Sequence, residues 1–282
     1  MSRQKVYCSF LVLVLCTVCV FVAIRWIDAY QKTTEVIFLN VGEGDAILFS
    51  QGSNQIFIDG GRSGKDLLAR LGRHLPFWDR TIEIVIATHP DADHIGGFAS
   101  LLSAYRVEKF LYTGAESKTE AFVLLKRALV ENQTDILKIS RGTKVELPGE
   151  GDIFIEYPLS ILPEEAAETN TGSIVARFTY GTTQMLFTGD LPSEEKMLPD
   201  IRPVDILKVA HHGSRYSTST DFLERLMPQE AVISVGKNSY GHPSPDVLKR
   251  LEEKNVKIRR TDTDGDTRYL CTEILAKCVF AR

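Results

Sequence analysis

The chain has 282 residues, 44% of them hydrophobic, with 33 basic against 37 acidic residues and a formal net charge of −4 at pH 7. This is the composition of a globular protein with one large domain or two small ones. A net negative chain argues against an extended basic face that grips long duplex DNA, although a bound metal ion could still hold a single phosphate. Nucleic acid is therefore allowed as a ligand and is not indicated.

An uncharged apolar run, Val6 to Ile24, opens the chain after Arg3 and Lys5. About twenty such residues cross the hydrocarbon core of a bilayer as a helix. Residues 1–31 are therefore predicted to form an N-terminal transmembrane anchor with a short polar linker. The alternative is a cleaved signal peptide and a secreted protein, although such peptides have a shorter apolar region and a small-residue cleavage site. The basic residues before the run predict a membrane-anchored body, residues 32–282, outside the cytoplasm.

The body is predicted to alternate strands and helices, which is the pattern of an α/β fold. Short runs rich in apolar and β-branched residues predict strands at Val36–Val41, Ala46–Phe49, Gln55–Ile58, Ile82–Ala87, Met185–Phe187, Ile206–Ala210 and Ala231–Val235. Helical patterns occupy Lys65–Leu75, His94–Tyr105, Lys118–Val130, Thr220–Leu226 and Pro245–Lys254. Near the C-terminus, Cys271 and Cys278 flank a predicted strand pair and could form a disulfide outside the cytoplasm.

The strand at Ile82–Ala87 ends in a turn that carries two imidazoles and two carboxylates, His89, Asp91, Asp93 and His94. Neighbouring carboxylates repel, and more strongly as they lose water, so a positive charge is needed among them. A divalent metal ion supplies that charge. Imidazole suits zinc and other transition ions, and carboxylates favour harder ions such as manganese or magnesium. The alternative, a solvated loop in which Asp93 only caps the next helix, explains one acid and neither histidine.

Polar groups also follow other predicted strands. Asp190 comes just after the strand Met185–Phe187, at a corner where turn chemistry alone could explain a lone acid. His211 and His212 follow the strand Ile206–Ala210, and imidazole is well suited to hold or protonate a phosphate oxygen near neutral pH. His242 stands in Gly-His-Pro, where a simple turn histidine is the alternative.

Six motifs in a fixed order indicate a known family. They are LNVGEGDAILF from Leu39, IDGG from Ile58, THPDADHIGG from Thr88, FTGD from Phe187, LKVAHHGS from Leu207 and YGHPSP from Tyr240. Together they resemble the metallo-β-lactamase superfamily, whose HxHxDH signature takes here the HxDxDH form of the soluble hydrolase domain of ComEC-type DNA-uptake competence proteins. The resemblance implies a four-layer αββα sandwich. It covers this hydrolase domain and not the multi-helix membrane channel of such proteins.

The resemblance also implies a set of metal ligands and supporting residues. The ligands are His89, Asp91, Asp93, His94, Asp190 and His242, with Asp190 bridging two ions. Asp59 corresponds to the acid that supports the metal loop through hydrogen bonds. The chain departs from the family in two places. Asp91 replaces the second histidine of the signature, and Asn170 to Ser173 stands where the family has a further histidine.

These departures predict two unequal sites that share Asp190. One is complete, with Asp93, His94 and His242 as its other ligands. The second, with His89 and Asp91, is poorer and harder, so one or two divalent metal ions, zinc or manganese, are expected.

The predicted activity is metal-assisted hydrolysis, in which the metal ion lowers the pKa of bound water and stabilises developing charge. Asp93 is expected to orient the hydroxide, and His211 or His212 to bind a substrate oxygen or protonate the leaving group. The HxDxDH form and the His-His-Gly-Ser corner resemble the phosphodiesterase and nuclease branches, so a phosphodiester, DNA included, is the expected substrate. The alternatives are another ester or lactone, a cell-surface phosphocholine diester, or a membrane-tethered, non-catalytic module for DNA uptake.

Overall fold

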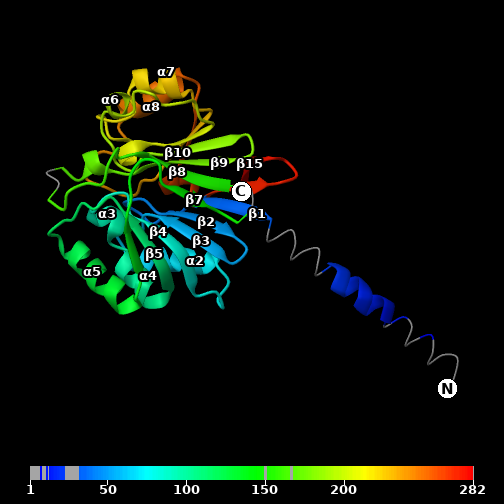
Figure 1. Ribbon diagram of the computed structural model, residues 1–282. Coiled ribbons are helices and arrows are strands. Elements are labelled where there is room, and N and C mark those ends of the chain that lie inside the picture. The colour runs from blue at the N-terminus through cyan, green and yellow to red at the C-terminus, as the bar shows by residue number, and fades with distance from the viewer. Residues whose placement is uncertain are drawn as a thin grey trace.

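The computed structural model describes residues 7, 11, 13–22, 32–148, 151–165 and 168–281 (Figure 1). The apolar run expected to anchor the chain lies partly outside these residues, and its described part, residues 13–22, is helical. Within the described ranges, no helix has the length and apolar character needed to span a bilayer. The first strand of the body begins at Thr33. The anchor, the alternative signal peptide and the boundary at residue 32 stay predictions.

Two β-sheets form the centre of the molecule. Among the described residues the first sheet has eight strands in the order β15-β14-β1-β2-β3-β4-β5-β6. Their bounds are β1 Thr33–Phe38, β2 Ile47–Gln51, β3 Asn54–Ile58, β4 Thr81–Ile86, β5 Arg106–Tyr112, β6 Asp135–Lys138, β14 Thr267–Thr272 and β15 Lys277–Ala281. Strands β3 to β6 pair in parallel, and β1 pairs antiparallel with β2, which pairs antiparallel with β3. As a result β1 and β3 to β6 run in one direction and end at one edge of the sheet.

The second sheet has seven strands in the same part of the chain, in the order β13-β12-β11-β10-β9-β8-β7. Their bounds are β7 Lys144–Glu146, β8 Gly151–Tyr157, β9 Val175–Tyr180, β10 Thr183–Phe187, β11 Ile206–Lys208, β12 Glu230–Ile233 and β13 Lys257–Arg260. Strands β10 to β13 pair in parallel. Their carboxyl ends therefore also meet at one edge.

Helices cover the outer face of each sheet (Figure 1). The first sheet is covered by α2 Gly64–His74, α3 Ala92–Ile95, α4 Phe98–Ala104 and α5 Glu120–Asn132. On the second sheet lie α6 Glu194–Met197, α7 Thr220–Leu226 and α8 Pro245–Glu253, and the short α9 Thr261–Asp264 follows β13. Because a helix buries one apolar stripe and a sheet can bury both faces, this arrangement needs three separate apolar layers.

The three apolar layers are present. One lies between the sheets, one between the first sheet and its helices, and one between the second sheet and its helices. Phenylalanine rings join the two sheets, since Phe49 lies 5.2 Å from Phe178 and 5.4 Å from Phe187 between ring centroids. Edge-to-face pairs of this kind add about 0.5–1.5 kcal/mol each beyond the area that they bury. The predicted α/β four-layer αββα sandwich is confirmed.

The helix predicted at His94–Tyr105 is wrong as a single element. It is divided into α3 and α4 at Gly96 and Gly97. A Cβ atom on Gly97 would lie 2.1 Å from the carbonyl oxygen of Gly60, so only glycine allows this approach. The Gly97 N–H donates to the carbonyl of Gly61 at 2.9 Å. The break therefore seats the loop after β4 against the corner that follows β3.

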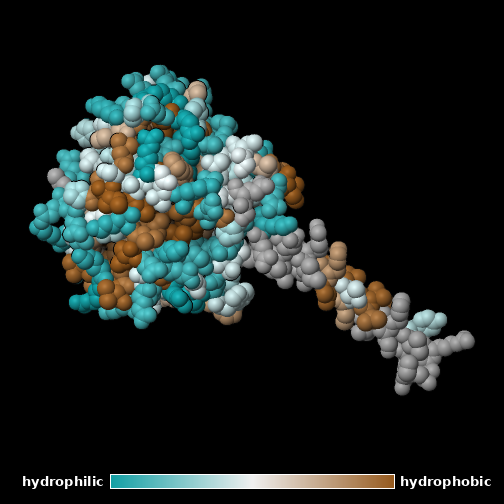
Figure 2. Space-filling model, viewed as in Figure 1, coloured by the Kyte–Doolittle hydropathy of each residue, from teal (hydrophilic) through white to brown (hydrophobic). Residues whose placement is uncertain are grey.

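Cys271 and Cys278 lie opposite each other on β14 and β15 and form a disulfide. The sequence allowed this bridge. The turn between the two strands, residues 273–276, exposes an apolar patch at one side of the molecule (Figure 2). On the inner side of the turn, the Thr182 N–H donates to the Ala276 carbonyl at 2.8 Å, which ties the hairpin to the β9–β10 turn of the other sheet.

Candidate active site

The candidate site lies where the carboxyl ends of parallel strands from both sheets meet. His89 follows β4 and Asp59 follows β3, while Asp190 follows β10 and His212 follows β11. Each of these four side chains is buried. Ligand sites in α/β proteins form at such strand ends, because the strands stop there and the connecting loops supply polar groups.

The loop after β4 turns directly into the short helix α3. Asp91 is the N-cap residue of α3, and its side chain makes no capping hydrogen bond. Asp93 and His94 lie in the first turn of that helix. The alternative in which Asp93 only caps a helix is therefore wrong, since neither acid is used by the backbone as a cap and both remain available to a ligand.

Four side chains bring nitrogen and oxygen atoms to one point. The Nε2 atom of His94 lies 3.3 Å from Asp190 Oδ2, and the Nε2 atom of His212 lies 3.4 Å from the same oxygen. His212 Nε2 is also 3.5 Å from Asp93 Oδ2. Ligand bonds of about 2.0–2.1 Å in a tetrahedron place neighbouring donor atoms about 3.3 Å apart. The observed separations match the edges of such a tetrahedron.

Buried atoms without partners also point to a cation. The Nε2 atoms of His89, His94 and His212 and the Oδ1 atom of Asp190 are buried and make no hydrogen bond among the described residues. Leaving a buried polar group unpaired costs about 1–3 kcal/mol. These atoms belong to groups of three whose ligand atoms lie within 4.8 Å of one another. Mixed imidazole and carboxylate donors suit zinc or manganese, so the residues present fit a divalent metal ion.

The opposite side of each imidazole is fixed by a hydrogen bond. His94 Nδ1 lies 2.7 Å from Asp59 Oδ2, and His212 Nδ1 lies 2.9 Å from the carbonyl oxygen of Ser234. Asp59 also accepts from the Thr88 N–H at 2.8 Å and from the Thr88 hydroxyl at 2.7 Å. With Nδ1 protonated and donating, Nε2 is the nitrogen free to bind a metal ion. The structure thus places Asp59 where it can support the metal loop.

Charge dominates the cluster. Burial alone would raise the pKa of Asp190, but His94 and His212 beside it hold that pKa well below the usual range. Burial would likewise raise the pKa of Asp93, and contact with His212 and the charge of His94 lower it instead. In return, Asp190 raises the pKa of His212 to about 10, against the effect of burial. The acids thus remain ionised and require positive charge next to them, as an imidazolium or as a metal ion.

Two buried charged residues behind the cluster had no role assigned from sequence. Lys208, the last residue of β11, forms an ion pair with Asp45, and both side chains are about 1% exposed. The Lys208 Nζ atom also donates to the Gly189 carbonyl at 2.9 Å and lies 3.8 Å from Asp190 Oδ1. Asp45 Oδ1 lies 3.5 Å from His212 Nδ1. Asp45 lies in the motif LNVGEGDAILF and Lys208 in LKVAHHGS. A charged residue within an apolar strand is the sequence feature that could have indicated a role for Lys208.

Three histidines, His211, His212 and His242, lie in different parts of the site. His212 lies inside the cluster, where the resemblance predicted His242. His211 is one-third exposed at the cleft, with its Nε2 atom 3.9 Å from Asp190 Oδ2. His242 lies at the rim, with its ring 5.5 Å from that of His211, and is absent from the groups of close ligand atoms found in the described chain. Its ligand role stays a prediction.

The consecutive residues His211 and His212 both have positive φ angles, 49° and 52°. Such angles are uncommon for residues other than glycine and cost of order 1–3 kcal/mol when the surroundings enforce them. The strained turn sends one imidazole into the cluster and the other toward the cleft. The strained backbone of this turn therefore lets two consecutive histidines face different parts of the site.

The second predicted metal position is less complete. His89 Nε2 lies 3.7 Å from Asp91 Oδ2, and the Asp91 side chain is 37% exposed. At the place of the family's further histidine, Ser173 accepts a hydrogen bond at 3.2 Å from the Asp190 N–H, so it positions the acid through the backbone. The inequality of the two sites predicted from sequence stays a prediction.

An open cleft of about 370 Å³ leads to the cluster. Its walls include Glu43, Arg62, Asp93, His211, Tyr240 and His242. Arg62 pairs with Glu43 at 3.2 Å and lies 3.8 Å from Asp93 Oδ2, which puts a cation at the mouth. The cleft also contains Asp91 and Asp190, so its acids outnumber Arg62, and an anionic substrate would need the positive charge of a bound metal ion.

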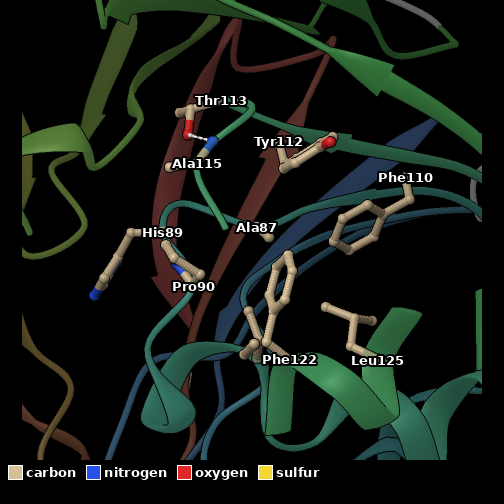
Figure 3. Close-up of a pocket in the computed structure, with 10 residues that line it drawn as sticks. Ala87, His89, Pro90, Phe110, Tyr112, Thr113, Ala115, Phe122 and Leu125 are labelled. Carbon is tan, nitrogen blue, oxygen red and sulfur yellow. Dashed lines mark hydrogen bonds between the residues drawn. The ribbon is translucent and has the colours of Figure 1, made fainter. Parts of the chain in front are cut away.

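A second cavity lies behind the metal loop and is apolar. It has about 10 Å³ of free space, and Pro90, Phe110, Phe122 and Leu125 are among its walls (Figure 3). One water needs about that much space and two or more polar partners, so this cavity is a packing gap and not a ligand site. The His89 ring points away from these apolar side chains (Figure 3). The cavity walls therefore support the loop from behind.

Comparison with known proteins agrees with this geometry. Residues 39–237 match the family model described as the metallo-beta-lactamase superfamily. The chain is 32% identical over 199 residues to ComE operon protein 3 of Bacillus subtilis (strain 168), a stretch that covers 67% of this chain and 25% of the relative. It is 27% identical over 268 residues to Recombination protein 2 of Haemophilus influenzae, covering 93% of this chain and 31% of that protein. The chain thus spans less than a third of either relative.

Among solved structures, the metallo-beta-lactamase fold protein YhfI from Bacillus subtilis is similar with a TM-score of 0.57 and 13% identity, covering 84% of this chain and 100% of that chain. At this identity the likeness concerns the fold. The family match covers well over half of the chain and includes the loop after β4 and the corners at Asp190 and His212. The chain belongs to the metallo-beta-lactamase superfamily and is similar in sequence to ComE operon protein 3 and Recombination protein 2.

Proposed function

We propose that this protein is a metal-dependent hydrolase of phosphodiesters that acts outside the cytoplasm. The proposal is based on a cluster of four side chains at the base of an open cleft, those of His94, His212, Asp93 and Asp190. Buried atoms of His94, His212 and Asp190 lack hydrogen-bond partners, and the distances between nitrogen and oxygen atoms of the cluster match those between metal ligands. A protein that only bound DNA would not need an open, buried cluster of metal ligands.

Each residue has a part in this chemistry. Asp93, His94, Asp190 and His212 would hold the ion, with His89 and Asp91 available for a second one. A bound divalent ion supplies Lewis acidity, lowers the pKa of water and stabilises developing negative charge. Asp93 lines both the cluster and the cleft, where its carboxylate would accept a hydrogen bond from the attacking water and orient it.

His211 is the residue that would contact the leaving-group oxygen of the substrate. Burial lowers the pKa of His211, so its imidazole is neutral near pH 7 and can donate one hydrogen bond to a substrate oxygen. His212 had been a candidate for the same role, but its Nε2 atom faces the acids. Arg62, whose side chain is half exposed, can bind a non-bridging phosphate oxygen beside Asp93.

A phosphodiester is supported by the hydrogen-bond donors of the cleft and by the positive charge that a bound metal ion would add. Arg62 and the two histidines of the rim face a cleft that has few apolar walls. One named relative is Recombination protein 2, and a role in recombination supports a nucleic-acid phosphodiester. Another ester or lactone, a cell-surface phosphocholine diester, and a non-catalytic role in DNA uptake are the competing functions.

One assay separates these functions. The full chain, freed of metal and then supplied with manganese or zinc, is given bis-p-nitrophenyl phosphate, a single-stranded oligonucleotide, p-nitrophenylphosphorylcholine, an aryl acetate and a lactone in parallel. Cleavage of the diesters, lost on chelation and absent in Asp93→Asn, is the expected result. Cleavage of the lactone or acetate alone contradicts the phosphodiester assignment. Oligonucleotide binding without cleavage under every metal condition supports the binding module.

A further inference from the structure

Two turns at the strand ends opposite the active site expose large apolar side chains. In the α2–β4 connection, Phe77 is 79% exposed and Trp78 is 72% exposed. In the β14–β15 turn, Ile274 is 96% exposed and Leu275 is 49% exposed. The two aromatic rings contact only each other edge to face at 4.9 Å among the ring pairs of the described chain. Exposed apolar groups gathered at one place mark a contact with another apolar phase.

Strand register puts both turns on the same edge of the first sheet. Thr33, the first residue of β1, pairs with Thr272, the last residue of β14, so the turn at 273–276 lies beside the start of β1. Strands β1, β3 and β4 run in one direction, so the connection that precedes β4 lies on this edge too. Four strand spacings separate β14 from β4, which is about 19 Å. Figure 1 shows the red β14–β15 turn and the blue start of β1 on the same side of the body.

The chain itself enters the fold at this edge. The uncharged apolar run 6–24 is joined to Thr33 by residues 25–32, which include Arg25, Asp28 and Lys32, so the strand that begins at this edge is the part of the body nearest in sequence to that run. Charges along the edge are nearly balanced, since Arg80 and Lys277 are offset by Asp79 and Glu273. An apolar surface with little net charge fits the interface of a lipid bilayer, where tryptophan and phenylalanine side chains are stable at the level of the headgroups.

We propose that this edge is a membrane-facing surface on which Phe77, Trp78, Ile274 and Leu275 dip into the lipid interface. Two turns about 19 Å apart, with the start of β1 between them on the same sheet edge, give a line of contact along that edge. The strands between the edges are five or six residues long, or about 17–20 Å. The active site therefore opens on the far side of the body, away from the bilayer.

The test uses Trp78 as a depth probe. The chain contains two tryptophans, so Trp26→Phe leaves Trp78 as the single emitter. This full-length variant is reconstituted into phosphatidylcholine vesicles with a rising fraction of lipid brominated near the headgroup end of its acyl chains. A blue-shifted emission that is progressively quenched by the brominated lipid is the expected result.

A matched control places the probe at the other edge. Leu159 follows β8 and is 64% exposed. Its neighbour Leu162 donates its N–H to the carbonyl of Thr113, which follows β5 at the active-site edge. In the Trp26→Phe, Trp78→Phe background, Leu159→Trp should keep a solvent-like emission without quenching by lipid.

Four outcomes overturn the proposal. They are solvent-like Trp78 emission in vesicles, equal lipid quenching of Trp78 and the Leu159→Trp probe, failure of the chain to associate with vesicles, and a Trp78 blue shift that depends on protein concentration and not on brominated lipid. The last would assign the edge to a contact between protein copies. None of these measurements uses hydrolysis, so their result is independent of the proposed activity.

Discussion

Replacing Lys208 with methionine should destabilise the metal-free protein strongly. Lys208 and Asp45 are each about 1% exposed and pair directly, and Asp190 lies 3.8 Å from the same ammonium group. Burial would lower the pKa of Lys208, but Asp45 and Asp190 raise it, so the group is charged in the folded protein. Methionine keeps the volume and leaves the buried carboxylate of Asp45 without its ammonium partner.

The magnitude follows from the loss of one partner of a buried pair, which costs about 3–5 kcal/mol. For a folded body of this size, each kcal/mol shifts the melting temperature by about 2–4 °C, so a fall of roughly 6–20 °C is expected. Asp45→Asn together with Lys208→Met removes both charges, and its loss should be smaller than the sum of the two single losses. A metal ion at 100 times its dissociation constant should restore about 2.7 kcal/mol where binding survives.

The assay is thermal unfolding followed by circular dichroism at pH 7 in the presence of a chelator, with the two single variants and the double variant side by side. Lys144→Met is the matched control, because Lys144 pairs with Glu146 at 3.2 Å on an exposed strand and its loss should leave the midpoint unchanged. An unchanged midpoint for Lys208→Met, or additive losses in the double variant, would refute the reasoning.

Asp93→Asn should abolish hydrolysis while keeping the fold. Asp91→Asn should retain activity and need more metal, as measured by titrating the hydrolysis rate with metal. Equal losses in both variants that added metal does not reverse would contradict two unequal metal sites. His212→Asn should lower the bound metal per chain, measured by atomic emission, and His242→Ala should lower it less, because the His242 ring lies at the rim of the cleft. Unchanged metal content in His242→Ala would contradict its predicted ligand role, and unchanged content in His212→Asn would contradict the cluster. Burial raises the pKa of Glu194 to about 7 from 4.5, so its proton stabilises the folded state below pH 4.5 and that contribution, about 3 kcal/mol, is lost as pH rises through 7. Glu194→Gln should flatten the unfolding free energy between these pH values, and an unchanged pH profile would contradict the assignment.

Much of the fold and the metal loop could be predicted from local sequence. The carboxylates and imidazoles of the loop stand within six residues at the end of an apolar strand, so chain connectivity alone brings His89 and His94 together. Strand and helix signals gave the α/β class, because strands and helices leave different periods in the sequence, and the four-layer sandwich was implied by the family resemblance. The same signals missed the break between α3 and α4, which depends on the backbone of Gly60 touching Gly97.

The tertiary structure was needed to identify the residues, far from the loop after β4 in sequence, that complete the site. His211 and His212 are neighbours in sequence, and only the two positive φ angles of their turn determine which ring faces Asp190. Lys208 stands in an apolar strand, where a sequence pattern predicts only burial, and its charge has a partner because the second sheet lies against Asp45 of the first.

Local sequence is enough to place a turn rich in potential metal ligands after a buried strand, and an apolar run before the body. Only the folded chain separates the two ends of the sheet, with His212 and Asp190 at one edge and Trp78 and Ile274 at the other. The physical reason is that strand direction and register are fixed by pairing between segments far apart in the chain, such as β1 with β14 and β10 with β11, and these pairings have no local signature.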